Sequence, residues 1–336
     1  MSRSPAGEPG PTADEPGPPA WGPGATPVSR VPTSGMLRPT GRVPRPVVVV
    51  GDVGIDVLTR AQMPVVQGGE ATSRISLVPG GAGGNTAAWL AAHAVDVSLL
   101  ARIGNDQAGV TARGALESAG VRCVFSVDDV LPTGVVVVLV DASGERTMFS
   151  DRGANTAFRA EGVLLDDAAN AVEAQGLPHL HLSGYVLLDA GSRAAGLAAL
   201  AEARVRGWTT SVDPQTAELV AEVGAAEFLG WVGGVDLLLP NEVEAQALGG
   251  PDAILAEVEQ VVVTYGADGA RWFTPEGDVR AAAPSVHCID STGAGDAFNA
   301  GLLASWLTDG DPARALHAAV AAGSAVAAGI GARPRL

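Results

Sequence analysis

The chain has 336 residues, a net charge of −16 and 47% apolar residues, enough to build one or two folded domains. All 21 residues in the lysine-plus-arginine count are arginines, so the sequence contains no lysine. The acidic net charge argues against a nucleic-acid-binding protein. The absence of a lysine side-chain amino group excludes P-loop NTPases, conventional protein kinases and Schiff-base enzymes.

The first 46 residues carry 12 of the 23 prolines and almost no apolar periodicity. Such a segment buries too little surface to offset its ordering entropy, so we predict a disordered tail over residues 1–46. No apolar run is long enough to span a membrane, and the N-terminus lacks the apolar core of a secretory signal. The two cysteines, Cys123 and Cys288, cannot build a disulfide framework. A cytoplasmic protein is therefore expected.

From Val47 onward, short apolar strands alternate with alanine-rich helical segments. The predicted strands are 47–50, 97–101, 135–140, 180–182, 209–212, 235–239 and 261–264, and the predicted helices are 86–94, 109–118, 194–205, 296–307 and 312–328. This alternation is typical of an α/β fold with a mostly parallel central sheet and helices on both faces. We predict one such domain over residues 47–336, with its ligands at the carboxyl ends of the strands.

Two segments interrupt the alternation. Residues 57–79 and 122–151 contain strand-like pieces with polar interruptions and no helix within them. We expect the two segments to pair as a small separate β-sheet. A small sheet over a cleft at the strand ends would act as a lid.

The first predicted strand ends in a turn that carries two carboxylates, Asp52 and Asp56. Carboxylates at a strand end suit a hydroxyl-rich ligand, although a solvated turn is the alternative, more strongly for Asp52. The glycine-rich loop 79–84 follows and ends at Asn85, which offers a donor and an acceptor. Glycine lets the backbone pack closely against a polar ligand there. A dinucleotide fingerprint is the competing interpretation, but no acidic residue ends a strand about 20 residues further on.

Two later segments are weak signals when taken alone. Asn241 and Glu244 have the spacing of a helix capping box, and they could also hold water bound to magnesium. Residues 264–269 are typical of an ordinary hairpin turn. His179 and His181 share one face of a strand, and an isolated pair of histidines on a strand is expected to be structural. His93, His287 and His317 have no partner at metal-ligand spacing.

The strongest signal is the run from Asp290 to Asp296, Asp-Ser-Thr-Gly-Ala-Gly-Asp, which leads into a helix. The amides of Gly293, Ala294 and Gly295 lie at the positive end of the helix dipole and form an anion site without any lysine. Asp296 lies beside that site, where a carboxylate could accept the proton of an attacking hydroxyl. The alternative is a structural glycine turn capped by aspartate, but two glycines, two aspartates and a threonine exceed what a cap needs.

In this order, the motifs resemble the ribokinase-like family of sugar and nucleoside kinases, the PfkB-type carbohydrate kinases, over about residues 47–333. The run 290–296 matches the family's C-terminal signature at every position, and the loop 80–85 matches its di-glycine signature. The segments 102–109 and 153–155 resemble further turns of that family. The resemblance implies the ribokinase-like three-layer fold with a β-sheet lid.

The resemblance also implies site roles. Asp296 would be the catalytic base, and the amides of Gly293, Ala294 and Gly295 would form the anion hole. Sugar binding would fall to Asp56, Gly80, Gly81, Asn85 and Asn155. Nucleotide binding would involve Asn241, Glu244, Thr264, Gly266 and Gly269, with Asn241 and Glu244 organising Mg²⁺ around the ATP phosphates. K⁺ would be bound by Asp290 and Thr292. The lid would exclude water and suppress ATP hydrolysis.

The implied activity is transfer of the ATP γ-phosphoryl group to a hydroxymethyl group of a sugar such as ribose, fructose or 2-keto-3-deoxygluconate. Ribokinase-type loops often carry a lysine where this chain has Ala82, and an alanine where it has Gly84, so ribose is not secure as the substrate. The scarcity of cations near this loop disfavours a phosphorylated sugar. A small-molecule substrate, no nucleic acid or membrane partner, and a homodimer through the lid are expected.

Three alternatives stay open. A nucleoside kinase of the same fold, for adenosine or pseudouridine, would need an apolar wall for the base, which Phe125, Met148 and Phe149 could supply. A sugar sensor without catalysis is disfavoured by the intact Asp296. A nicotinamide-dependent oxidoreductase rests only on the partial fingerprint in the glycine loop.

Overall fold

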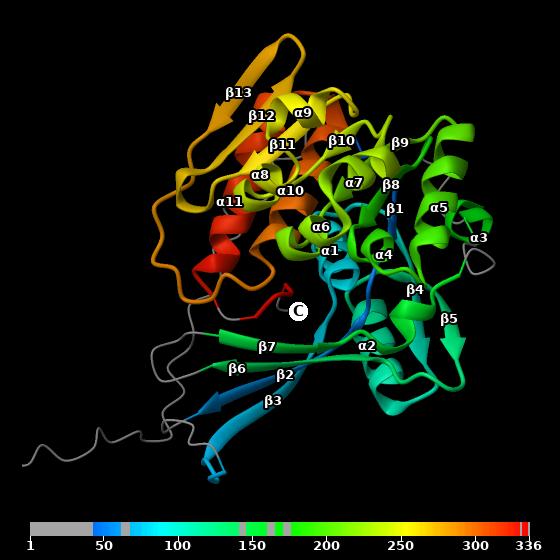
Figure 1. The fold of residues 1–336 in the computed structure, drawn as a ribbon, viewed down its shortest axis with the longest axis vertical. Coiled ribbons are helices and arrows are strands. Elements are labelled where there is room, and N and C mark those ends of the chain that lie inside the picture. Colours follow the sequence, from blue (N-terminus) through cyan, green and yellow to red (C-terminus); the bar gives the residue numbers. More distant parts are fainter. Residues whose placement is uncertain are drawn as a thin grey trace, which may run out of the picture. The chain divides into compact units, whose positions relative to one another are not determined.

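Four consecutive valines form β1 (Val47–Val50), a completely buried strand inside a nine-stranded sheet (Figure 1). The computed structural model describes residues 43–61, 68–140, 146–159, 165–170, 176–329 and 331–334. Most of the predicted tail, residues 1–42, lies outside this part of the chain. The last tail residues belong to the fold, because the Arg45 amide donates to the Leu307 carbonyl and the Pro46 carbonyl accepts from the His179 amide.

The predicted strands are present, most of them extended by one to three residues, and further strands complete the two sheets. After β1, the strands are β2 (Gly54–Ala61), β3 (Ser73–Gly80), β4 (Val97–Gly104), β5 (Arg122–Asp128), β6 (Gly134–Val140), β7 (Arg146–Asp151), β8 (His179–Ser183), β9 (Thr209–Asp213), β10 (Leu237–Leu238), β11 (Val261–Thr264), β12 (Ala270–Thr274) and β13 (Gly277–Ala281). The segment predicted as a strand over 235–239 pairs only at its two central leucines.

The helices between these strands are α1 (Ala82–Ala92), α2 (Gln107–Ser118), α3 (Leu165–Asn170), α4 (Tyr185–Leu188), α5 (Arg193–Val205), α6 (Ala217–Val223), α7 (Ala225–Val232), α8 (Glu242–Ala247), α9 (Pro251–Leu255), α10 (Ala294–Asp309) and α11 (Pro312–Ala327). Asp106 and Asp311 cap α2 and α11 as their sequences indicate. Helix α1 begins four residues earlier than predicted, so the second half of the glycine loop forms its first turn.

The large sheet has the strand order β13-β12-β11-β10-β9-β8-β1-β4-β5. The strands from β11 to β5 run parallel, and β12 and β13 continue antiparallel as a hairpin. This arrangement confirms the predicted α/β class with a mostly parallel central sheet. It also brings the carboxyl ends of β1, β8, β9 and β11 to one edge, as ligand binding in this fold class requires.

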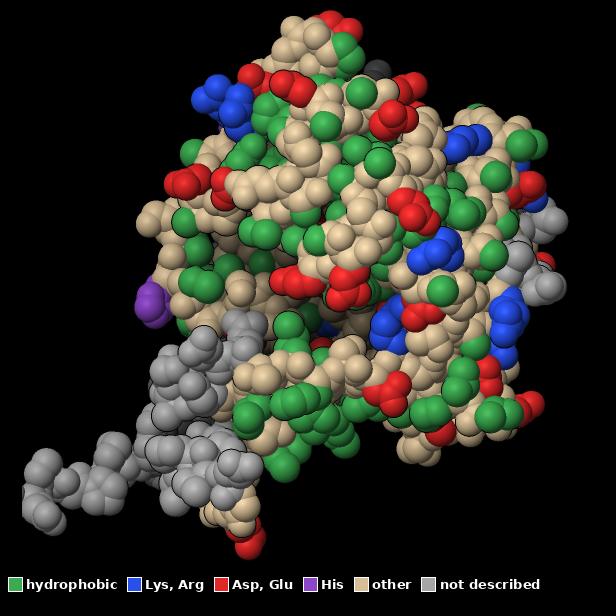
Figure 2. Space-filling model, viewed as in Figure 1, with side chains coloured by type: hydrophobic (Ala, Val, Ile, Leu, Met, Phe, Trp, Pro, Cys, Tyr) green, Lys and Arg blue, Asp and Glu red, His purple; other side chains and the backbone are tan. Residues whose placement is uncertain are grey.

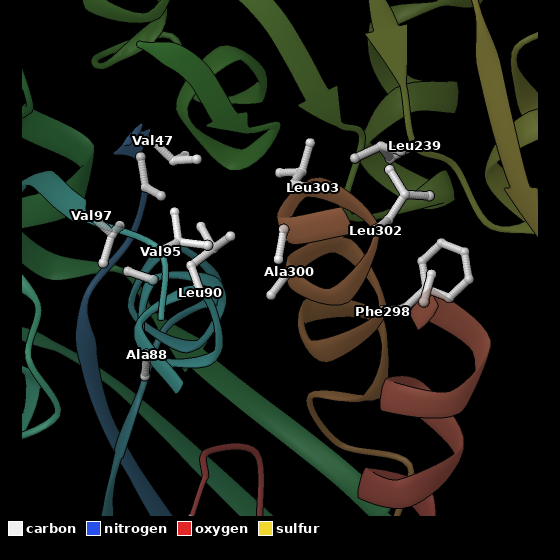
Figure 3. Close-up of a cluster of buried hydrophobic side chains, with 14 of the residues drawn as sticks. Val47, Ala88, Leu90, Val95, Val97, Leu239, Phe298, Ala300, Leu302 and Leu303 are labelled. Atoms are coloured by element: carbon white, nitrogen blue, oxygen red, sulfur yellow. The ribbon is translucent and has the colours of Figure 1, made fainter. Parts of the chain in front are cut away.

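Two hydrophobic clusters show that helices cover both faces of the sheet. Val47 and Val49 belong to one cluster with residues of α1, α2, α10 and α11, whereas Val48 and Val50 belong to a second cluster with residues of α3 to α9. Figure 3 shows part of the first cluster, with Val47 together with Ala88 and Leu90 of α1 and residues of α10. The division follows from the alternation of side chains along a strand. The fully apolar strands are therefore buried between two helical layers.

A four-stranded sheet with the order β3-β2-β6-β7 is separate from the large sheet and is the small second sheet that the sequence predicts as a lid. The boundaries differ from the prediction at both segments. The lid begins at Gly54, and β5 belongs to the large sheet, where it pairs parallel with β4 along its full length. Helix α2 links β4 to β5 as a crossover connection, which returns the chain to the same sheet rather than to the lid.

Candidate active site

Helix α10 begins at Ala294, directly after the glycine turn of the strongest motif. Gly293 has φ 75°, and a Cβ atom there would lie 2.6 Å from Ala332, so this turn requires glycine. The amide of Ala294 donates to the Ser291 carbonyl at 3.1 Å, which holds the turn closed. Gly295 is exposed, so the amino end of the helix is open toward the cleft; of the three amides predicted to form the anion site, that of Ala294 is bonded within the turn.

Asp296 joins the two strongest motifs of the sequence. Its Oδ2 accepts a hydrogen bond from Asn85 Nδ2 at 3.0 Å, and its Oδ1 accepts a longer one from Thr86 Oγ1 at 3.5 Å. Burial raises the pKa of Asp296 to about 6, and Asn85 and Arg333 oppose that rise. A carboxylate with this pKa is ionised at neutral pH and close to the range of an effective general base.

Asp56 lies on β2 beside the glycine loop. A Cβ atom on Gly80 would lie 2.1 Å from the Asp56 carboxylate, so the side chain occupies the space that the glycine leaves. Within the described chain, no hydrogen bond is made to that carboxylate, and burial raises its pKa to about 6. Gly81 has φ 89° and lies against the backbone of Asp52. The site therefore offers an open carboxylate for a hydroxyl-rich ligand.

A cavity lies between the start of α10 and the carboxyl ends of β9 to β11, and it contains six of the predicted site residues. Its lining is Asp213, Gln215, Leu239, Asn241, Glu244, Thr264, Gly293, Gly295, Asp296 and Asn299. Figure 2 shows the hollow between the lid strands and the rest of the domain, with acidic side chains beside it. The structure thus brings predicted catalytic and nucleotide-binding residues to one cavity.

Asn241 and Glu244 form the capping box that their spacing predicts, with mutual hydrogen bonds of 2.8 and 2.9 Å. Burial raises the pKa of Glu244 to about 7. Thr264 reaches the same place because its amide donates to the Pro240 carbonyl. Gly266 and Gly269, in contrast, have positive φ angles and shape the β11–β12 hairpin without lining the cavity.

Four cavity residues were not predicted from the sequence, Asp213, Gln215, Leu239 and Asn299, and two of them, Asp213 and Asn299, form a polar pair. Asn299 Nδ2 donates to Asp213 Oδ2 at 2.6 Å, and burial next to Glu244 raises the pKa of Asp213 well above its usual range. Asp213 follows a predicted strand and Asn299 lies one helical turn after Asp296, so both positions carried a detectable signal. The oxygen atoms of Asp213 and Glu244 fit a hard divalent cation such as Mg²⁺.

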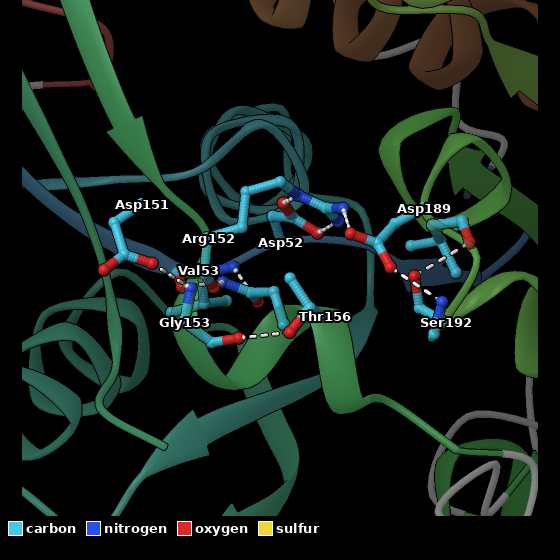
Figure 4. Close-up of polar contacts among 11 residues, drawn as sticks. Asp52, Val53, Asp151, Arg152, Gly153, Thr156, Asp189 and Ser192 are labelled. Carbon is cyan, nitrogen blue, oxygen red and sulfur yellow. Dashed lines mark hydrogen bonds and ion pairs between the residues drawn. The ribbon is translucent and has the colours of Figure 1, made fainter.

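The end of β1 contains a buried ion-pair network rather than a second ligand-binding carboxylate (Figure 4). Arg152 donates to both oxygens of Asp52 at 2.8 and 2.9 Å and forms an ion pair with Asp189 at 2.9 Å. Asn155 uses both of its amide protons on the carbonyls of Val53 and Arg152. Both amide protons of Asn155 therefore hold the strand end, and the contact of Asn155 with a sugar stays a prediction.

The two residues predicted to bind a monovalent cation lie on the other side of the signature loop. Asp290 accepts from the amides of Thr292 at 2.9 Å and Gly331 at 3.4 Å, which ties the C-terminal segment to the loop. Both residues line a second cavity with Leu58, Arg60, Val138, Val140 and Ile289. The histidine pair is structural as expected, because His179 and His181 bond to the hydroxyls of Thr209 and Ser211.

The C-terminal segment adds a residue that the sequence did not indicate. Arg333 Nε donates to Asn85 Oδ1 at 2.9 Å, and Arg333 Nη2 donates to the Gly80 carbonyl at 2.7 Å. Burial lowers the pKa of Arg333 to about 10, so the group is cationic at neutral pH. No motif marks this arginine, which is separated from Asn85 by 248 positions.

An anion site, several carboxylates and an open cavity lie together at the carboxyl ends of the strands. This combination is typical of a site that transfers a phosphoryl group. The family model for pfkB family carbohydrate kinases matches residues 45–336, so the chain belongs to that family. An ATP-dependent ribose-1-phosphate kinase from Halopiger xanaduensis is 34% identical, over 85% of this chain and 93% of the relative. The chain is accordingly a kinase acting on a sugar hydroxyl group.

Solved structures share the fold of this chain. A fructokinase double mutant from Vibrio cholerae, with fructose, ADP and potassium bound, is 26% identical with a TM-score of 0.72, covering 87% of this chain and 94% of that one. A chain assigned as a ribokinase II from E. coli, with ATP and Mg²⁺, has a TM-score of 0.75 at 23% identity, covering 86% and 94%. Among the described helices, none is long and apolar enough to cross a membrane.

Proposed function

We propose that this protein transfers the γ-phosphoryl group of ATP to a hydroxymethyl group of a sugar, with Asp296 as the general base. The hydrogen bond of 3.0 Å between Asn85 and Asp296 carries the proposal, because it joins the sugar-binding loop to the anion site. Asp296 takes the proton of the acceptor hydroxyl as its oxygen bonds to the γ-phosphorus. The bond from that phosphorus to the β-phosphate oxygen breaks, and ADP leaves.

The chain's own groups supply the charge stabilisation. The amino end of α10, at Gly293 and Gly295, faces the transferred group and offers fixed amide dipoles. Asp213 and Glu244 would hold Mg²⁺ through their oxygen atoms, and the ion would neutralise charge on the ATP phosphates. Asp290 and Thr292 stay the proposed ligands of K⁺, supported by the potassium-bound fructokinase structure.

The candidate acceptors are ribose, fructose, 2-keto-3-deoxygluconate and, from the name of the Halopiger relative, ribose 1-phosphate. The nucleoside alternative has less support. Phe125 packs into the core of the large sheet, and Phe149 lies in the cross-strand row of Val57 and Val137, on the lid face opposite to Asp56. Two of the three residues expected to form an apolar wall are therefore outside the cleft.

We also propose a homodimer through the lid. Leu77, Val57, Val137 and Phe149 form one cross-strand row, in which Leu77 is 71% and Phe149 60% exposed. Figure 2 shows hydrophobic side chains gathered over these strands. Because a contiguous exposed apolar face marks an interaction site, Phe149→Asp should convert a dimer to a monomer in light scattering. A wild-type monomer at micromolar concentration would contradict this assignment.

A coupled assay of ADP release tests the proposed activity across these acceptors, with adenosine and pseudouridine included. We expect ADP formation that depends on a sugar acceptor and on Mg²⁺. Mass analysis of the product should show one added phosphoryl group on the sugar. No acceptor-dependent ADP release with any of the compounds would overturn the proposal, and preference for a nucleoside would favour the alternative.

A further inference from the structure

Arg333 brings a cation into the proposed sugar site, although the glycine loop itself carries none. Its guanidinium bonds to Asn85 and to the Gly80 carbonyl, two groups of the predicted sugar-binding loop. Asp56 and Asp296 are close enough to raise its pKa, against the larger lowering by burial. The guanidinium therefore lies among the groups that would contact the acceptor.

Within the described residues, Arg333 forms no direct ion pair with a carboxylate. Both of its hydrogen bonds go to neutral carbonyl oxygens, whereas Arg102 and Arg152 bond directly to carboxylates. Its Nη1 atom is buried and makes no hydrogen bond there. A buried guanidinium with an unpaired N–H group has the donors that a phosphate or carboxylate ligand accepts from.

The loop sequence is adapted to this arginine. A Cβ atom on Gly84 would lie 2.4 Å from Arg333 Nη2, so glycine at this position leaves the space that the guanidinium fills. The segment is also held from both sides, because Trp89 Nε1 donates to the Ala332 carbonyl at 2.8 Å and Gly331 bonds to Asp290. Gly84 and Arg333, which come from opposite ends of the domain, therefore depend on each other for this arrangement.

We infer that this site selects a sugar that carries an anionic group, bound by Arg333, over the corresponding neutral sugar. The inference rests on the proposed function and names the substrate class of the same site. It also revises the expectation from the sequence, which disfavoured a phosphorylated sugar because it counted cations only near the loop. A phosphate ester or a sugar carboxylate would supply the same chemistry.

The test compares kcat/KM for ribose 1-phosphate with kcat/KM for ribose. A second comparison sets kcat/KM for 2-keto-3-deoxygluconate against kcat/KM for fructose. We expect the wild-type enzyme to prefer one anionic acceptor by about 100-fold or more, because a site with unpaired buried donors rejects the analogue that lacks the acceptor group. Arg333→Met should remove most of this preference, and Arg333→Lys should restore part of it. Arg314→Met, at an exposed ion pair on α11, is the matched control.

Gly84→Ala gives an independent check. Its added methyl group should displace the Arg333 guanidinium and so lower the preference for the anionic acceptor when Arg333 is present. In the Arg333→Met background the same substitution should have little further effect on the acceptor ratio. Binding of ribose 1-phosphate without ATP, measured by calorimetry, separates recognition from turnover. Activity on ribose or fructose that equals activity on the anionic acceptors, or an unchanged ratio in Arg333→Met, overturns the inference and leaves the proposed kinase activity intact. Absence of activity on all acceptors refutes the proposed function instead.

Discussion

Replacing Asp296 by asparagine should abolish most of the activity and stabilise the fold at the same time. The substitution preserves shape and an oxygen that can accept from Asn85, but it removes the group that takes the acceptor proton. Loss of a general base lowers turnover by roughly 10²–10⁴-fold. In the wild type, kcat/KM should fall as the pH drops through about 6, because protonated Asp296 cannot act as a base.

The effect on stability follows from the same pKa. Burial raises the pKa of Asp296 from 3.8 to about 6, which corresponds to about 3 kcal/mol of unfavourable free energy for the charged form at pH 7. An asparagine side chain at this position would carry no such charge, so the free energy of unfolding of Asp296→Asn should rise by up to that amount. At pH 5, still above the pI near 4.6, the gain should be about half as large.

Urea unfolding at both pH values, together with the coupled ADP assay, measures the two effects on the same preparations. Asp252→Asn is the matched control, because Asp252 also lies in the first turn of a helix but is exposed. It should change neither turnover nor stability by a comparable amount. Turnover of Asp296→Asn close to wild type, or a lower stability than wild type at pH 7, would refute the reasoning.

Three further predictions concern stability. Arg152→Met should lower the free energy of unfolding by about 3–5 kcal/mol in urea titrations, because it leaves the buried Asp52 unpaired; an unchanged midpoint would contradict this. Gly293→Ala should cost about 1–3 kcal/mol and raise the KM for ATP, since φ is 75° and Ala332 blocks the new methyl group; a wild-type KM and melting temperature would argue against it. Burial raises the pKa values of Asp56 to about 6 and Glu244 to about 7, so the native state holds more protons than the unfolded chain and stability should fall as the pH rises from about 4 to 7. The ligand-free protein should melt at a higher temperature at pH 5.5 than at pH 8, and the reverse order would exclude this account.

The fold class and the position of the candidate site could both be predicted from local sequence patterns. Runs of β-branched residues such as Val47–Val50 favour buried strands, and their alternation with helices is typical of a covered parallel sheet. The run from Asp290 to Asp296 indicated an anion site beside a carboxylate, because glycine geometry and the helix dipole are local properties. The capping box at Asn241 and Glu244 was likewise readable from spacing alone.

Which polar groups are available to a ligand could be seen only in the folded chain. Asn155 matches a family turn, yet its amide bonds to the strand end, and Asp52 is paired with Arg152. Strand β5 pairs with β4 in the large sheet, and the local sequence does not specify which strand will be its partner. Arg333 and Gly84 meet only when the chain is folded, and no local pattern reports a contact between residues so distant in sequence. Side-chain charges and hydrogen bonds are satisfied through space, so their assignment depends on packing that the local sequence does not encode.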